Sequence, residues 1–235
     1  MVSMTGRAVG QGLGQGLGKL MSSSIGIEII YSFVIILCSL MIYFGTRELY
    51  KLSSHKGIKY FRQSFLFFAL AYFFRSFIKI ILFYFDAGEI RALLPIFGNI
   101  TLFIFMYFSS MAIFYLIYSV MWKKWKSKSI VYLFHLMAFA IAIIIILFRN
   151  QFVYLLINLL LFVFIAFIFY KSHRQSKKKK SHHLYIIYLL LFVFWIFNII
   201  DILIPNYLQT FQLFIYLISL GIFLSILYKV IRRIG

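Results

Sequence analysis

The sequence predicts an all-α membrane protein, a bundle of seven transmembrane helices with its N-terminus outside and its C-terminus in the cytoplasm. Composition is the first observation: 64% of the 235 residues are hydrophobic and 12% are charged. Soluble domains are typically about 45–50% apolar and about 25% charged. The lengths of the apolar runs and the placement of the basic residues are the other two observations.

Seven apolar runs account for most of the chain. They cover residues 25–45, 64–85, 92–121, 130–148, 152–170, 184–204 and 210–228. A transmembrane helix needs about 20 mostly apolar residues, within a range of roughly 17–25. The third run is longer, so we expect it to tilt or to extend past the membrane. The runs lack the alternation of a barrel strand, and helices satisfy every backbone hydrogen bond within lipid.

The N-terminal segment differs from the rest of the chain. Residues 6–18 are rich in glycine and glutamine, and glycine disfavours helix formation. We therefore expect residues 1–24 to form a flexible tail, followed by a single seven-helix transmembrane domain over residues 25–235.

The orientation follows from the lysines and arginines, which number 24. Eighteen of them lie in the connections 46–63, 122–129 and 171–183 and in the C-terminal tail, whereas four lie on the opposite side. This alternation matches the excess of positive charge in cytoplasmic loops of membrane proteins. The N-terminus is thus predicted outside, in a multi-pass protein of the cell membrane whose main partner is the lipid bilayer.

The formal net charge of +19 does not indicate nucleic-acid binding, because the basic residues are confined to short connections between spans. One run, Lys177, Lys178, Lys179 and Lys180, is dense enough to contact anionic lipid, at about 1 kcal/mol for each residue near the surface. The alternative is that this run only enforces the topology.

Polar residues within the spans are the candidate functional residues, because ionisable groups in hydrocarbon cost about 2.5–3.5 kcal/mol each on insertion scales. With the predicted orientation they fall in the outer half of the bundle, apart from Arg75 near mid-membrane. They are Glu28, Arg75, Lys79, Asn99, Asn158, Asn198 and Asp201. We expect them to form a polar pocket in which Glu28 and Asp201 balance the charge of Arg75 and Lys79.

A purely structural network of the same residues is the competing interpretation. Asparagines within the membrane often only join helices, by hydrogen bonds of about 0.6–2 kcal/mol, and a terminal lysine can extend to the interface. His135, inside the fourth span, is interpreted as a packing residue. Trp122 and Trp125 border the cytoplasmic face, where indole side chains favour the interface.

No sequence motif indicates catalysis. HExxH, GxSxG and phosphate-binding loop motifs are absent, and the chain has only five acidic residues, too few for the clusters that bind divalent metals. We expect no enzymatic activity, no catalytic residues, no metal and no cofactor. A sensory, receptor-like or ligand-binding module acting through a membrane or cytoplasmic signalling partner is the first functional hypothesis. A transporter of small solutes or lipids, or a structural subunit of a membrane complex, is the alternative.

Overall fold

The computed structural model describes residues 24–84, 94–123, 125, 129–148, 182–203 and 209–232, with scattered positions between 153 and 167. The described residues form six long α-helices and no strand, which confirms the all-α class. The helices are α2 (Ser24–Ser53), α3 (Lys56–Tyr84), α4 (Leu94–Met121), α5 (Ser129–Phe148), α7 (His182–Leu203) and α8 (Gln209–Ile231). Residues 1–23 of the tail predicted over 1–24, and most of the predicted fifth span, lie outside the described residues.

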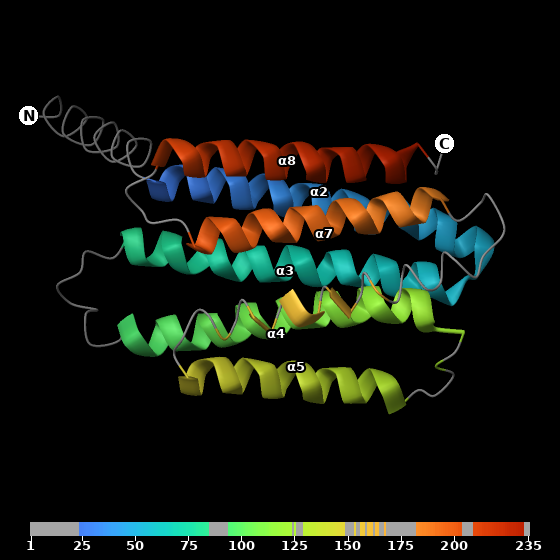
Figure 1. Ribbon diagram of the computed structural model, residues 1–235, viewed down its shortest axis with the longest axis horizontal. Helices are drawn as coiled ribbons and strands as arrows, with labels where there is room; N and C mark the ends of the chain where they lie inside the picture. The colour runs from blue at the N-terminus through green and yellow to red at the C-terminus, as the bar shows by residue number, and fades with distance from the viewer. Residues whose placement is uncertain are drawn as a thin grey trace, which may run out of the picture.

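The described helices lie side by side with their axes nearly parallel (Figure 1). Along the chain, α2 packs on α3, α3 on α4 and α4 on α5, and α8 packs on both α7 and α2. Helices α2, α4 and α8 run in one direction and α3, α5 and α7 in the other, so the C-terminal ends of the first three share one end of the bundle with the N-terminal ends of the second three (Figure 1). At this end lie Arg47 and Lys51 of α2, Lys56 and Lys59 of α3, and Lys123 just after α4, and it is called the basic end below.

Helix bounds differ from the predicted spans mainly at the first connection. The prediction of a long connection over residues 46–63 is wrong, because only Ser54 and His55 separate α2 from α3. Hydropathy reports where a helix leaves the apolar layer, whereas lysine and arginine are good helix formers that let it continue in water. The other described helices agree with the expected runs to within three residues.

An aromatic core holds α3, α7 and α8 together. Phe65 of α3, Phe194 of α7 and Phe223 of α8 are fully buried, with ring centroids 5.0 Å apart for Phe194–Phe223 and 6.1 Å apart for Phe65–Phe223. Small residues are buried as well, among them Ala69 of α3 and Ala112 of α4. Small side chains at such positions let helix backbones approach closely.

The outer surface of the bundle is apolar. On α5, Tyr132, Leu136 and Leu147 are exposed to more than two thirds of their area, and large apolar side chains are also exposed on α2 and α8. Four helical segments are long and apolar enough to cross a membrane: Gly26–Ser53, Ile96–Met121, Ser129–Phe148 and Phe211–Ile231. The α5 helix has 20 residues, a length of about 30 Å, which matches the hydrocarbon layer of a bilayer.

The tight turn between α2 and α3 brings the start of α3 against the end of α4. Ser54 has a positive φ of 49°, and its backbone N–H donates to the carbonyl of Tyr50 at 2.8 Å. A Cβ atom at Gly57 would lie 2.8 Å from the backbone oxygen of Ser119 and 2.9 Å from Nε1 of Trp122. Only glycine therefore fits at residue 57 without displacing the end of α4.

Replacing Gly57 with alanine should lower the stability of the protein, because the added methyl group would clash with the backbone oxygen of Ser119 in α4. We expect a loss of about 1–3 kcal/mol, measured as a lower unfolding temperature in detergent. Gly221→Ala is the matched control, because nothing lies within 4 Å of a Cβ atom there. Equal unfolding temperatures for the two variants would contradict the close contact at Gly57.

The His55 side chain, outside the predicted spans, gives a prediction about pH. Partial burial, and then the charge of Lys123, lower the pKa of His55 below its ordinary value of 6.5. The unfolded chain therefore holds this proton more tightly than the folded protein, and stability falls as the pH drops through about 6.5. We compare the unfolding temperatures of the wild type and of His55→Gln between about pH 8 and pH 5. As the pH is lowered, the unfolding temperature of the variant should decrease less than that of the wild type. Parallel curves would contradict this role of His55.

Candidate functional site

An ion pair between α2 and α3 forms the centre of the candidate site. Both Nε and Nη2 of Arg75 donate to Oε1 of Glu28, at 3.1 Å and 2.6 Å. The two side chains are only 18% and 12% exposed, so the pair is largely removed from solvent. The predicted contact of Arg75 with a carboxylate inside the bundle is thus present, with Glu28 as the partner.

Helix geometry places both charges away from the basic end. Glu28 lies in the second turn of α2, and Arg75 lies nine residues before the end of α3. At a rise of about 1.5 Å per residue, the guanidinium is carried by a backbone position roughly 14 Å from that helix end. The pair therefore lies in the half of the bundle where the sequence predicted a polar pocket.

Aromatic rings surround the ion pair. The Arg75 guanidinium carbon lies 5.9 Å from the ring centroids of both Tyr72 of α3 and Phe105 of α4. Such contacts between a cation and an aromatic face contribute about 0.5–2 kcal/mol. They also bring a third helix, α4, into contact with the charged residue.

A second layer of rings joins α2 to α8 beside the pair. The Tyr31 ring stands edge-on to Tyr72, with centroids 6.1 Å apart, and stacks on Tyr216 of α8 at 4.5 Å. Nε2 of Gln212 donates to the Tyr216 hydroxyl at 3.0 Å. Residues of α2, α3 and α4 therefore contact the Arg75 guanidinium, and the Tyr31 ring connects this group to α8.

These tyrosines were not predicted from the sequence, although a signal for two of them exists. Tyr31 is three residues after Glu28, and Tyr72 is three residues before Arg75, so each shares a helix face with a charged residue. The chain has 30 phenylalanines and 17 tyrosines, and at that density a single ring carries no information. Only the spacing relative to the charges could have identified these two.

The structure describes only some of the other predicted polar residues. Asn99 is half-buried on α4. The Lys79, Asn198 and Asp201 side chains lie outside the described part of the structure, although their backbones belong to α3 and α7, and Asn158 and the run Lys177–Lys180 lie entirely outside it. The pocket role of these residues stays a prediction.

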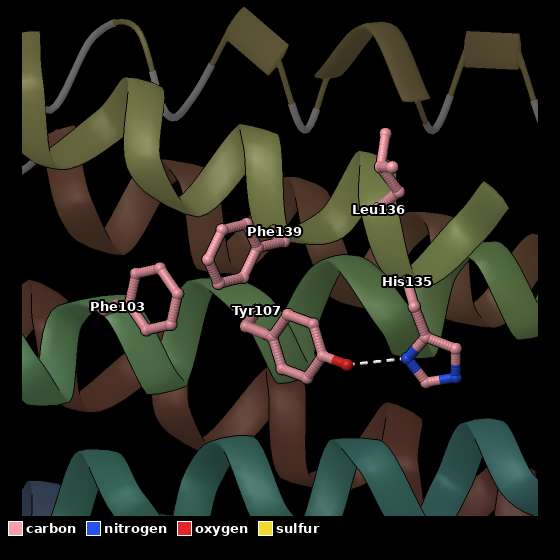
Figure 2. A pocket seen from close by; sticks show the side chains of 5 residues that line it. All are labelled: Phe103, Tyr107, His135, Leu136 and Phe139. Carbon is pink, nitrogen blue, oxygen red and sulfur yellow. Dashed lines mark hydrogen bonds between the residues drawn. The ribbon is translucent and has the colours of Figure 1, made fainter. Parts of the chain in front are cut away.

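A second feature is a shallow hollow between α4 and α5, shown in Figure 2. It has a volume of about 360 Å³ and is lined by Phe103, Tyr107, His135, Leu136 and Phe139. The Tyr107 hydroxyl and Nδ1 of His135 are hydrogen-bonded at 2.6 Å. The rings of Phe103 and Phe139 lie on the side of the Tyr107 ring away from His135 (Figure 2). His135 is thus held by a partner on the neighbouring helix, as expected of a packing residue.

Neither feature has the composition of a metal centre. Within the described ranges, no group of three histidine, cysteine, aspartate or glutamate side chains could hold a metal ion. The ion pair instead offers one cation and one anion in an aromatic surrounding. Such a surrounding suits a small charged organic molecule better than a metal ion.

Breaking the ion pair should destabilise the protein. Removing one partner of a largely buried pair costs about 3–5 kcal/mol, because the remaining charge stays desolvated. We expect Arg75→Met and Glu28→Leu each to lower the unfolding temperature strongly, and the double variant that carries both substitutions to be closer to wild type than either single variant. Additive effects of the two single substitutions would show that the charges are not coupled.

One known protein matches the chain along most of its length. It comes from Archaeoglobus fulgidus, is described as an uncharacterized protein, and is 34% identical over 213 residues, which cover 89% of this chain and 93% of the relative. No known family profile matches the chain, and no solved structure does. At this identity and coverage, the chain belongs to the same protein family as the Archaeoglobus fulgidus protein.

Proposed function

We propose that the chain is a multi-pass protein of the cell membrane with seven spans, its N-terminus outside and the basic end in the cytoplasm. Four described segments have the length and apolar character of membrane spans. The antiparallel order of the helices supports the orientation, because it brings the basic residues at the ends of α2 and α4 and at the start of α3 to one end (Figure 1). Such a charge asymmetry is typical of proteins whose basic end faces the cytoplasm.

We further propose that this bundle is a receptor-like module that binds a small organic anion at Arg75. The buried Arg75–Glu28 ion pair is the observation that carries the proposal. Stability alone does not account for such a pair, since well-packed apolar residues often replace a buried ion pair without loss. Charged residues within a membrane span are rare, and they commonly mark a ligand or ion site.

The surroundings of the pair favour a carboxylate with an apolar body as the ligand. A ligand carboxylate would accept the same guanidinium hydrogen bonds that Glu28 accepts at 2.6 Å and 3.1 Å. Its apolar part would pack against Tyr72 and Phe105, whose rings both lie 5.9 Å from the guanidinium carbon. In this arrangement Glu28 occupies the ligand position in the unbound protein.

Displacement of Glu28 provides a route for signalling. The pair joins α2 to α3, and α2 also packs on α8, whose last turn lies at the basic end. A ligand that releases Glu28 from Arg75 weakens one contact between α2 and α3 and so favours a different packing of α2. A partner at the basic end would detect that change as a small helix shift, a common form of switching.

Benzoate tests the proposal because it combines a carboxylate with an aromatic ring. We expect benzoate to raise the unfolding temperature of Glu28→Gln more than that of wild type, since the competing carboxylate is gone, and to leave Arg75→Gln unchanged. Benzyl alcohol, which lacks the charge, is the control ligand. Equal benzoate shifts in wild type and both variants, or none in any of them, would contradict binding at Arg75.

Vesicles containing the protein separate a receptor from a transporter. A receptor binds benzoate without accumulating it, so radiolabelled benzoate should enter protein-containing and empty vesicles at the same rate. Faster uptake that is lost in Arg75→Gln would instead support the transport alternative.

A further inference from the structure

A second cavity lies at the basic end, far along the helices from the Arg75–Glu28 pair. It has a volume of about 680 Å³ and lies where the end of α2, the start of α3 and the end of α4 meet. Pockets for small ligands typically measure about 300–1,000 Å³. Its described walls include Lys56, Lys59, Tyr60, Trp122, Lys123 and Trp125.

All of the charged residues that line this cavity in the described part of the chain are lysines. Lys56 and Lys59 are three residues apart and so share one face of α3, and Lys123 follows the end of α4. None of the described lining residues is acidic. Three ammonium groups around one hollow repel one another, and a bound anion would remove that repulsion.

Two further features add positive potential at the same place. Helix α3 begins at Lys56, so the partial positive charge of its N-terminus is next to the cavity. Burial, and then the charge of Lys123, lower the pKa of the neighbouring His55, so Lys123 adds to the positive potential at this place. The His55 ring stands edge-on to Trp122, with centroids 4.8 Å apart.

Aromatic side chains that pack against one another in the wall of the cavity distinguish it from a cluster of solvated lysines. Tyr118 is 5% exposed, and its hydroxyl donates to the backbone carbonyl of Trp125 at 3.1 Å. Its ring packs against Tyr60 at 4.3 Å and stacks on Trp125 at 6.3 Å. These contacts hold the two sides of the cavity together before any ligand binds.

We propose that this cavity is an anion site that binds a phosphate group, either the headgroup phosphate of an anionic lipid or a small soluble phosphate ester. Lysine donors around a helix N-terminus suit phosphate oxygens, and indole and phenol rings suit the glycerol and upper acyl region that follows in a lipid. The site is separate from the Arg75–Glu28 pair and does not rest on the proposed receptor function.

The test uses the tryptophans of the cavity as reporters. The chain has three tryptophans, and two of them, Trp122 and Trp125, line the cavity. In a Trp195→Phe background, the full-length protein is placed in phosphatidylcholine nanodiscs containing increasing amounts of phosphatidic acid, and tryptophan emission is recorded. A parallel series adds inorganic phosphate and glycerol 3-phosphate to nanodiscs of phosphatidylcholine alone.

We expect a saturable change in emission, and a loss of affinity of about fivefold for Lys59→Gln and for Lys123→Gln, from the usual contribution of one lysine near an anionic lipid. Lys51→Gln is the matched control, since Lys51 is an exposed lysine at the same end that does not line the cavity. Saturation by phosphatidic acid alone assigns the site to lipid, and saturation by the soluble phosphates assigns it to a soluble ester.

Two results would overturn the proposal. One is an emission change that does not saturate with any of the probes. The other is an equal loss of affinity in Lys51→Gln and Lys59→Gln, which would show attraction to the whole basic end instead of binding in the cavity. Unfolding temperatures of the variants, all of which change exposed lysines, verify that each protein is folded.

Discussion

Apolar side chains on the outside of the helices set the main constraint on this molecule. Phe33, Leu136 and Phe214 are each exposed by more than half of their area, on three different helices. Such a surface is stable when it contacts hydrocarbon, and every backbone hydrogen bond must then be made within the helices themselves. The long helices, their antiparallel order and the short α2–α3 turn are all consistent with this single requirement.

A charge inside such a bundle needs a partner from the same protein, and Glu28 is that partner for Arg75. The ion pair fixes α2 against α3 near one end, while the Gly57 contact fixes α3 against α4 near the other. Between them, the aromatic core of Phe65, Phe194 and Phe223 packs α3 against α7 and α8. The proposed ligand site and the proposed phosphate site thus lie at opposite ends of α3, the helix common to all of these contacts.

The sequence predicted helix class and helix positions well, because long apolar runs have few alternative structures in lipid. It also predicted that Arg75 contacts a carboxylate, because a deep cation needs one and the chain has few, but it left Glu28 and Asp201 as alternatives, and the structure shows Glu28. It could not predict that α2 ends at Ser53 and α3 begins at Lys56. Lysine and arginine are good helix formers in water, so a change from apolar to charged residues does not mark the end of a helix. The cavity at the basic end depends on how α3 meets the end of α4, a tertiary contact that no local pattern contains.

Accessibility of single cysteines tests most directly whether these helices cross a membrane with the basic end inside. In a Cys38→Ala background, Lys51→Cys reports on the basic end and Gln209→Cys on the opposite end of the bundle. An impermeant maleimide applied to intact cells should label Gln209→Cys at once, and Lys51→Cys only after the membrane is permeabilised. Labelling of Lys51→Cys in intact cells, with Gln209→Cys protected, would contradict the proposed orientation.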